Sequence, residues 1–291
     1  MDIIAVDIGN SGISMGVFVK DELRETVHFD AKEPEGLVKT IKSMRVMCGE
    51  QEFGARTVAV VVSSVNPPAE IKLSEAVKEA LDQEILLIGR DVGLDMKLAV
   101  ENPESVGTDR LLTAMAAYAV VENAVVVADF GTATTIDCVD HYGIFLGGAI
   151  LPGLDLAAKS LNEHTVQLPR VKPQVPTGGY GTNTEAAIQY GIYYGAIGAL
   201  QGIVEKYATQ LGQWPQLVLT GGYARLIKEK CDFADSYVPN LCLDGIFLAY
   251  RKWRESRDRD VQSEMKELEQ WLDEEGKSDK GNGGLKAHPT A

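Results

Sequence analysis

The sequence predicts an α/β fold made of two related halves, each a mixed sheet flanked by helices. First, a strand, tight turn and strand pattern with an aspartate at the end of its first strand occurs twice, at Ile3–Phe18 and at Val125–Val139. Second, each copy is followed by another strand and then by alternating helical and apolar strand segments. Two copies of one hairpin in a chain of 291 residues suggest a nucleotide held between two related domains.

The composition limits the class of protein. Apolar residues make up 45% of the chain and charged residues 24%, as in ordinary globular proteins. The net charge of −14 argues against a general nucleic-acid binder, which needs a basic face. No apolar run is long enough to span a membrane, and the N-terminus does not resemble a signal peptide. The four cysteines show neither a C-x-x-C pair nor zinc-ligand spacing, so we expect reduced thiols in a cytoplasmic protein.

The first half begins with a predicted three-stranded meander. Continuous apolar runs then predict buried strands, and apolar residues at helical spacing predict helices between them. In order, we expect the meander over 2–29, a helix over 34–47, a strand over 57–64, a helix over 66–81 and a strand over 85–88.

A polar loop, Val100–Arg110, precedes an apolar helix predicted over Leu111–Val121. Asp109 and Arg110 therefore stand at the start of a strongly hydrophobic helix. Two interpretations remain open from the spacing: an N-cap aspartate beside an exposed arginine, or a pair with a chemical role.

The second half repeats the pattern of the first. We expect the hairpin over 125–139, a strand over 144–150, helices over 154–163 and 185–210, a strand over 217–220 and a final helix over 245–253. The helix over 185–210 carries many small residues, which fit core packing, our default interpretation, or a subunit contact.

The composition changes to charged residues from about Glu255. An apolar stripe there predicts a short amphipathic helix (Val261, Met265, Leu268, Leu272), and 276–291 is predicted to be disordered. We therefore expect an N-terminal domain over 1–118, a C-terminal domain over 119–255 and a tail over 256–291.

The two hairpins have the features of phosphate loops. Gly131 allows a close approach that a Cβ would block, so the turn can direct N–H groups and the Thr132 and Thr134 hydroxyls at an anion. Asp129 supplies negative charge for a cation beside that anion. Each copy alone also fits an ordinary hairpin with a glycine turn. Likewise, Gly221–Gly222 lets a flat group lie close to the chain, or forms a plain strand-to-helix turn.

Several motifs, in order along the chain, resemble those of type III pantothenate kinases, a family of the actin-like ATPase superfamily with ribonuclease H-like domains. The family's Asp-x-Gly-Asn-Thr, Asn-Pro-x-x-Val-Gly-x-Asp-Arg, Asp-Phe-Gly-Thr-Ala-Thr-Thr and Gly-Gly-x-Ile-x-Pro-Gly resemble 7–11, 102–110, 129–135 and 147–153. Its Thr-x-x-Leu-Pro, Gly-x-Asn-Thr and Thr-Gly-Gly resemble 165–169, 181–184 and 220–222. Together the matches span about residues 3–250.

The resemblance implies ATP-dependent phosphorylation of pantothenate to 4′-phosphopantothenate, the first step of coenzyme A biosynthesis. Asp109 would be the catalytic base, Asp7 would hold Mg²⁺ directly or through water, and Asp129 would bind a monovalent cation, K⁺ or NH₄⁺. The ATP site would comprise Asp7, Ile8, Gly9, Asn10, Ser11, Gly12, Ile13, Ser14, Gly131, Thr132, Gly221 and Gly222. The pantothenate site would comprise Val100, Gly107, Thr108, Asp109, Arg110 and Thr184. Members of the family are dimers with this site near the interface, which implies a homodimer.

Four positions depart from the family pattern. Val100 and His164 stand where Tyr and Arg are common, Ser11 replaces Thr but keeps the hydroxyl, and Gly12 replaces a polar residue. Two alternatives therefore remain: a kinase of another small hydroxyl substrate, or a non-catalytic nucleotide-binding regulatory relative. A dinucleotide-binding oxidoreductase is disfavoured because no G-x-G-x-x-G follows the first strand.

Overall fold

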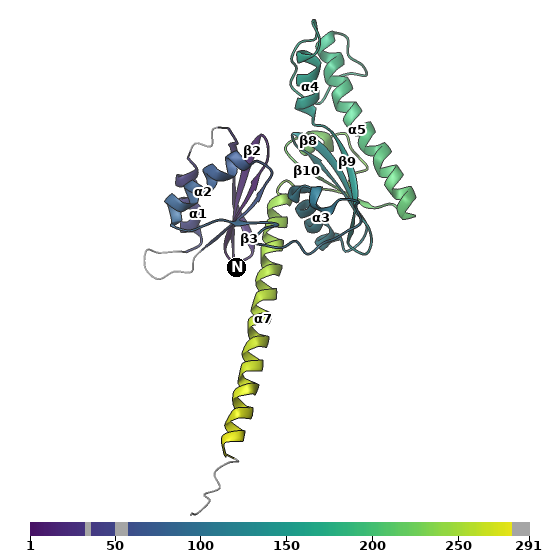
Figure 1. Cartoon of the computed structure of the whole chain (residues 1–291). Helices are drawn as coiled ribbons and strands as arrows, with labels where there is room; N and C mark the ends of the chain where they lie inside the picture. The colour runs from purple at the N-terminus through teal and green to yellow at the C-terminus, as the bar shows by residue number, and fades with distance from the viewer. Residues whose placement is uncertain (33–35, 50–57, 281–291) are drawn as a thin grey trace, which may run out of the picture. The chain divides into compact units, whose positions relative to one another are not determined.

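The computed structural model describes residues 1–32, 36–49 and 58–280, without the side chains of 260, 264 and 267–280 (Figure 1). The chain divides into two compact units, with the boundary between Ala249 and Tyr250. Both sheets belong to the first unit. Among the described residues, no helix is both long enough and apolar enough to cross a bilayer.

The first sheet contains five strands in the order β3-β2-β1-β4-β5. Their bounds are β1 Ile3–Ile8, β2 Gly12–Val19, β3 Glu22–Asp30, β4 Ala59–Ser64 and β5 Leu86–Leu87. The predicted meander is confirmed, and β4 pairs parallel to β1 as its continuous apolar run suggests. Helices α1 (Leu37–Met47) and α2 (Pro67–Leu81) lie side by side and bury their apolar stripes with β1 and β4 (Figure 1).

The second sheet has six strands in the order β11-β10-β7-β8-β9-β6. Their bounds are β6 Lys97–Leu98, β7 Val125–Phe130, β8 Ala133–Val139, β9 Ile144–Pro152, β10 Gln216–Thr220 and β11 Ser236–Tyr237. From β9 to β11 this order repeats the order from β3 to β5, so the duplication seen in the sequence extends to the sheets. Strand β6 is an addition that pairs parallel to β9 at the edge of the sheet.

Helices cover both faces of the second sheet. Helix α5 (Thr184–Leu211) and the short α6 (Ala224–Lys228) pack on one face with β7 and β10, and α4 (Leu154–Glu163) follows β9. Helix α3 (Thr108–Val121) packs on the other face, against Val125, Val127 and Phe145. The helix that carries Asp109 and Arg110 is therefore fixed to the second sheet.

The last helix, α7 (Leu241–Lys280), begins within the first unit, where it packs against both the first sheet and α3. The rings of Phe18 and Phe247 stack with centroids 4.5 Å apart, and a Cβ at Gly245 would overlap the backbone of Leu112. These contacts bring Cys242 and Leu243 to the region between the two hairpins.

Several boundaries differ from the sequence-based expectations. Helix α3 starts at Thr108, three residues earlier than predicted, because Gly107 rather than a polar residue is its N-cap. Helix α7 is continuous where two helices were predicted, and it includes Gly276–Lys280, which we expected to be disordered. No proline interrupts it, and its two glycines, Gly245 and Gly276, are tolerated in so long a helix. The strands β6 and β11, helix α6 and a 3₁₀ turn at Pro103–Ser105 are too short to give a periodic signal.

The small residues of α5 do not pack as expected. We expected core packing, but the glycines of this helix lie on its exposed side, and a Cβ on any of them would meet no other atom within 4 Å (Gly191, Gly195, Gly198, Gly202). The residues that face the core are instead large, among them Tyr193, Leu200 and Val204. The default interpretation is therefore wrong for the glycines, although Ala196 packs against the core, and an external contact remains the alternative for them.

Candidate active site

A cavity of about 490 Å³ lies between the two hairpins. Both predicted phosphate loops, the start of α3, the Gly221–Gly222 turn and the start of α7 contribute to it. Of the predicted site residues, those that line it are Asp7, Gly9, Asn10, Ser11, Gly12, Ser14, Asp109, Arg110, Asp129, Gly131, Thr132, Gly221 and Gly222.

The first loop connects β1 to β2. Its turn is closed by the Gly9 N–H, which donates to the Gly12 carbonyl at 2.9 Å, and by Asn66, whose side-chain amide donates to the Gly9 carbonyl at 3.2 Å. Asn10 and Ser11 are exposed at the tip and line the cavity. The side chains of Ile8 and Ile13 are fully buried in the core beneath the loop, so they anchor it.

The second loop connects β7 to β8 and meets the first across the cavity. The Thr132 hydroxyl donates to the Ser11 hydroxyl at 3.0 Å, although the two residues are 121 positions apart. The Gly131 N–H closes its turn by donating to the Ala133 carbonyl at 3.1 Å. Two hydroxyls and two glycine turns thus face one space, an arrangement that suits the oxygens of a phosphate chain.

The turn after β10 also lines the cavity, through Gly221 and Gly222. Gly221 has φ +92°, in the left-handed region, and a Cβ there would overlap the Asp129 carboxylate and the Phe130 backbone. Only glycine satisfies both conditions without strain. Gly221 and Gly222 therefore form the strand-to-helix turn between β10 and α6, and the Gly221 backbone in addition lies directly against Asp129.

Three carboxylates line the cavity: Asp7, Asp109 and Asp129. Burial, followed by the charge of Asp109, raises the pKa of Asp7 to about 7, and a hydrogen bond from the Cys242 thiol partly opposes the rise. Burial, followed by the charge of Asp7, raises the pKa of Asp129 to about 7 as well. Like charges taken out of water repel one another, so this cavity favours a bound cation.

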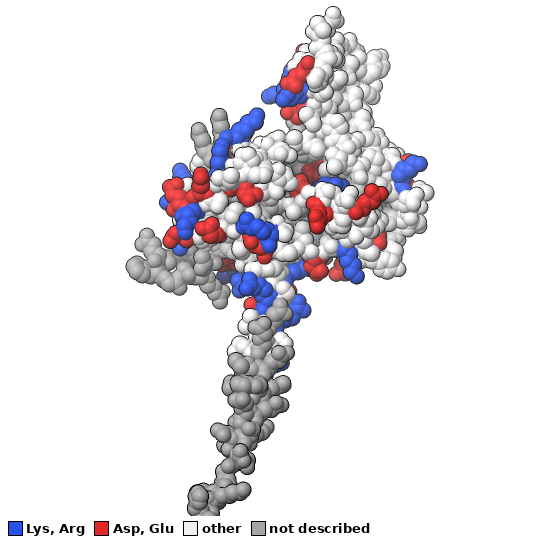
Figure 2. Space-filling model, in the orientation of Figure 1, with Lys and Arg blue, Asp and Glu red and all other residues white. Residues whose placement is uncertain are grey.

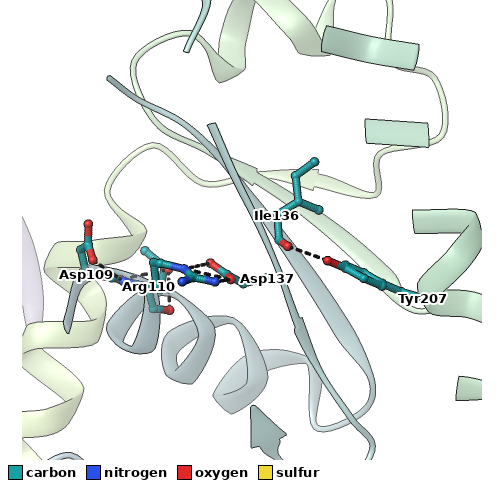
Figure 3. Close-up of polar contacts among 6 residues, drawn as sticks. Asp109, Arg110, Ile136, Asp137 and Tyr207 are labelled. Atoms are coloured by element: carbon teal, nitrogen blue, oxygen red, sulfur yellow. Dashed lines mark hydrogen bonds and ion pairs between the residues drawn. The ribbon is translucent and has the colours of Figure 1, made fainter. Parts of the chain in front are cut away.

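Asp109 and Arg110 are neighbours on α3 but point in different directions (Figure 3). The Asp109 carboxylate accepts the backbone N–H of Arg110 at 2.8 Å. The Arg110 side chain instead pairs with Asp137 on β8, with its Nε 3.1 Å from each carboxylate oxygen. The interpretation as an N-cap aspartate beside an exposed arginine is wrong, because Gly107 is the N-cap and the Arg110 side chain is only 17% exposed.

Four predicted substrate residues do not line this cavity. Val100 packs with the core under α3 and lies against Gly147. Gly107 leaves room for the Asp109 carboxylate, which a Cβ would overlap, and the Thr108 hydroxyl hydrogen-bonds that of Ser63 at 2.9 Å. Thr184 begins α5 after its N-cap, Asn183. Gly107 and Thr108 thus hold the start of α3 in place.

Other residues of the cavity had no signal in the sequence. A hydrogen bond of 3.0 Å joins Ser14 Oγ to Nδ1 of His28 on the neighbouring strand β3. The Cys242 thiol reaches Asp7 from the start of α7. Lone residues of these types carry no motif, and they come near the loops only through the packing of α7 and the pairing of β2 with β3.

The site's donors suit a cation that keeps part of its water shell. Among the described residues, no three His, Cys, Asp or Glu side chains form a group that could hold a metal ion. Mg²⁺ is commonly bound by one or two carboxylates together with water and substrate phosphates. Asp7 and Asp129, beside two phosphate loops, fit that requirement.

Comparisons with known proteins agree with this geometry. The sequence model of the type III pantothenate kinase family matches residues 3–206. The chain belongs to this family. A type III pantothenate kinase from Anaeromyxobacter sp. (strain Fw109-5) is 35% identical over 257 residues, which cover 87% of this chain and 100% of that protein. One from Dehalococcoides mccartyi (strain CBDB1) is 32% identical over 256 residues, which cover 86% and 95%.

Solved structures confirm the fold of this type III pantothenate kinase family member. A protein described as a Baf family transcriptional activator from Campylobacter jejuni is 21% identical, with a TM-score of 0.53 and coverage of 86% of this chain and 98% of that one. A protein described as a 2-dehydro-3-deoxygalactonokinase from Sinorhizobium meliloti has a TM-score of 0.51 at 12% identity, covering 86% and 96%. At these identities the likeness concerns the fold, which is the predicted actin-like ATPase architecture.

Proposed function

We propose that this chain transfers the γ-phosphate of ATP to the primary hydroxyl of pantothenate and forms 4′-phosphopantothenate, the first step of coenzyme A biosynthesis. The observation that carries the proposal is the cavity itself. Two phosphate loops face each other across it, and a carboxylate on α3 lies in the same space. Phosphoryl transfer depends mainly on positioning and charge neutralisation, which such a cavity supplies.

ATP would be held by the loops of both sheets. Asn10, Ser11 and Thr132 offer side-chain donors to the phosphates, and the glycine turns allow the chain to approach them closely. Gly222, exposed beside Gly221, would border the nucleoside. The volume of about 490 Å³ falls within the usual range for a small-molecule site.

Asp109 would act as the base for the acceptor hydroxyl. One of its oxygens is occupied by the Arg110 N–H, which fixes the carboxylate and leaves the other oxygen free for the substrate proton. Among the described residues that line the cavity, Arg110 is the only Lys or Arg. Its charge is therefore the natural partner for the carboxylate of pantothenate.

Two cations would complete the site. Asp7 would hold Mg²⁺, directly or through water, and Asp129 a monovalent cation such as K⁺ or NH₄⁺. When bound, these ions would neutralise charge on the phosphates and on the two carboxylates. The raised pKa values of Asp7 and Asp129, each about 7, support this assignment because both groups lack a cationic partner that offsets their burial.

We also propose that the protein is a homodimer, as the family resemblance implies. The exposed side of α5 is formed by glycines, and this helix of 28 residues carries only three charged side chains (Glu185, Glu205 and Lys206). Figure 2 shows that charged side chains are sparse over α5. A sedimentation measurement that finds only monomer at micromolar concentration would contradict the dimer.

The deciding experiment is an assay of the purified chain with ATP, Mg²⁺ and pantothenate, with K⁺ or with choline at equal ionic strength. We expect 4′-phosphopantothenate, identified by its mass, to form faster with K⁺. A panel of other small alcohols serves as control for the acceptor. If folded protein that binds ATP makes no product from pantothenate, the proposal fails, and product from another alcohol would identify a different kinase.

A further inference from the structure

The ion pair between Arg110, which lines the cavity, and the buried Asp137 is a strong polar contact that the proposed reaction does not use. It joins α3 to the middle of β8, and it combines Nε, which is 3.1 Å from both carboxylate oxygens, with a second bond from Nη2 to Oδ1 (Figure 3). The Arg110 guanidinium also lies over the Phe145 ring, 5.7 Å from its centroid. The arginine is therefore held in one orientation.

Asp137 is a buried carboxylate whose ion pair with Arg110 is supplemented by a hydrogen bond from the Thr135 side chain. Its side chain is 1% exposed, and it is not among the residues that line the cavity. Its neighbour across the sheet is Gly148 on β9, where a Cβ would overlap the Asp137 carboxylate. Burial raises the pKa of Asp137, and the ion pair with Arg110 works against that rise. The fold thus accepts a buried carboxylate whose main partner is Arg110.

The charges around the cavity show that Asp137 prevents Arg110 from pairing with another carboxylate. Arg110 is adjacent in sequence to Asp109, and Asp7 and Asp129 line the same space. A long, flexible cation beside three carboxylates pairs with one of them unless another anion holds it. Pairing with Asp109 would stabilise the ionised base and block its approach to a hydroxyl proton. Among the described residues, no hydrogen bond involves Nη1 of Arg110 while Asp137 holds Nε and Nη2.

We propose that Asp137 is a positioning residue for the acceptor substrate: it anchors Arg110 away from Asp109 and presents the free edge of the guanidinium to the substrate carboxylate. The proposal rests on the proposed function, since it takes pantothenate as the acceptor. Asp137 touches neither substrate nor ATP in this arrangement. Its strongest contact is the ion pair with Arg110, so its loss should affect the acceptor and leave ATP binding unchanged.

The test is steady-state kinetics of Asp137→Asn, Arg110→Lys and the double variant, with pantothenate and ATP varied separately. A misplaced substrate group can lower turnover about 100-fold, so we expect kcat/KM for pantothenate to fall by about that factor in Asp137→Asn. The KM for ATP should stay within about twofold of wild type, because the phosphate loops are untouched. Arg110→Lys keeps the charge but loses the two-pronged anchor, and should show the same selective loss.

The double variant separates positioning from general structural support. If Asp137 acts through Arg110, the double variant should be no worse than the more impaired single variant. The matched control is Asp91→Asn, which breaks an Arg–Asp pair of similar geometry between Arg90 and Asp91 outside the cavity. It should leave both KM values unchanged.

The outcomes of these measurements decide whether Asp137 positions Arg110. Wild-type kinetics in folded Asp137→Asn, or equal rises in both KM values with losses that multiply in the double variant, would overturn the positioning role. If Asp137→Asn does not fold, the Arg110→Lys variant tests the proposal in its place. An unchanged pantothenate KM in Arg110→Lys would overturn the proposal. Wild-type protein that does not phosphorylate pantothenate would overturn the proposed function, and this inference with it.

Discussion

The five strands of the first sheet have equivalents in the second sheet, in the same order. One pair of equivalent positions in the second strand of each hairpin, Gly16 and Asp137, carries very different side chains. In the first sheet Asp7 pairs with Ser14, and two residues before it Ala5 pairs with Gly16. In the second sheet Asp129 pairs with Thr135, and two residues before it Val127 pairs with Asp137. Gly16 has no side chain and is covered by Leu23 and Leu243, whereas Asp137 carries the ion pair to Arg110.

This difference shows how the duplicated hairpins came to serve different parts of one site. The shared features are the strand-end aspartate and the glycine turn, which suit phosphates in both copies. The second sheet has α3 packed over one face, and the proposed acceptor residues Asp109 and Arg110 come from that helix. Under the proposed function, the matching features would hold ATP and the unmatched ones the acceptor.

The largest expected effect concerns the acceptor side. Asp109→Asn should keep the fold and lower kcat by roughly 100- to 10,000-fold, because an amide cannot accept the hydroxyl proton. The measurement is kcat with saturating ATP and pantothenate. Asp155→Asn is the matched control, since Asp155 also lies in the first turn of a helix but is exposed and away from the cavity. Turnover like that of wild type in Asp109→Asn would refute the assignment of the base.

The next prediction compares Gly221, which follows β10, with the equivalent residue at the end of β4. Gly221→Ala should lower the free energy of unfolding by roughly 2–4 kcal/mol, since alanine is strained at φ +92° and its Cβ would overlap Asp129. The equivalent residue is Ser64 at the end of β4, whose hydroxyl accepts the Asn66 N–H at 3.3 Å. Ser64→Ala should lower it by only about 0.5–1.5 kcal/mol. Urea unfolding measures the free energy of unfolding of both variants, and equal losses in the two would contradict this prediction.

A third prediction concerns pH. The pKa of Asp129 is raised from its usual 3.8 to about 7, so the folded protein binds this proton more tightly than the unfolded chain. That contribution to stability is fully present below about pH 4 and is lost as the pH rises through about 7. Without Mg²⁺ and K⁺, Asp129→Asn should therefore be more stable than wild type at pH 8.

The pH experiment also sharpens the comparison between the two aspartates. Asp7→Asn should stabilise the cation-free protein in the same direction, because burial raises the pKa of Asp7 to about 7 as well. The measurement is the thermal midpoint of each variant minus that of wild type from pH 4 to pH 8. The advantage should vanish near pH 4 and shrink when the cations are added. A difference that is constant with pH would show that the carboxylate charge is not its cause.

The smallest effect tests whether the two loops act together. The hydroxyls of Ser11 and Thr132 meet at 3.0 Å across the cavity, so each should contribute about one hydrogen bond to the phosphates or to the other loop. Ser11→Ala and Thr132→Val should each raise the KM for ATP by roughly three- to tenfold. Ser11→Thr keeps the hydroxyl and should be neutral. A change in the pantothenate KM alone would place these hydroxyls elsewhere in the site.

The local pattern of the sequence was enough to predict most of the fold. Long apolar runs and helical spacing predicted β1, β4, β7 and the helices α2 and α4, because such segments have one stable way to bury their apolar residues. The same pattern failed for β6 and β11, which have only two residues each, and for the side of α5 that meets the core. Both sides of α5 carry apolar or small residues, so helical periodicity does not indicate which side faces the core.

By itself, the sequence determined the family, the duplicated hairpins and the aspartates that end their first strands, because these depend on short contiguous patterns of residues. Only the tertiary structure decided which of these residues share one cavity, why Arg110 turns away from Asp109, and that Cys242 reaches Asp7. Those facts depend on contacts between residues far apart in the chain, such as Arg110 with Asp137 and Ser11 with Thr132. A single sequence carries no signal of such pairs, since each partner alone fits an ordinary strand, turn or helix.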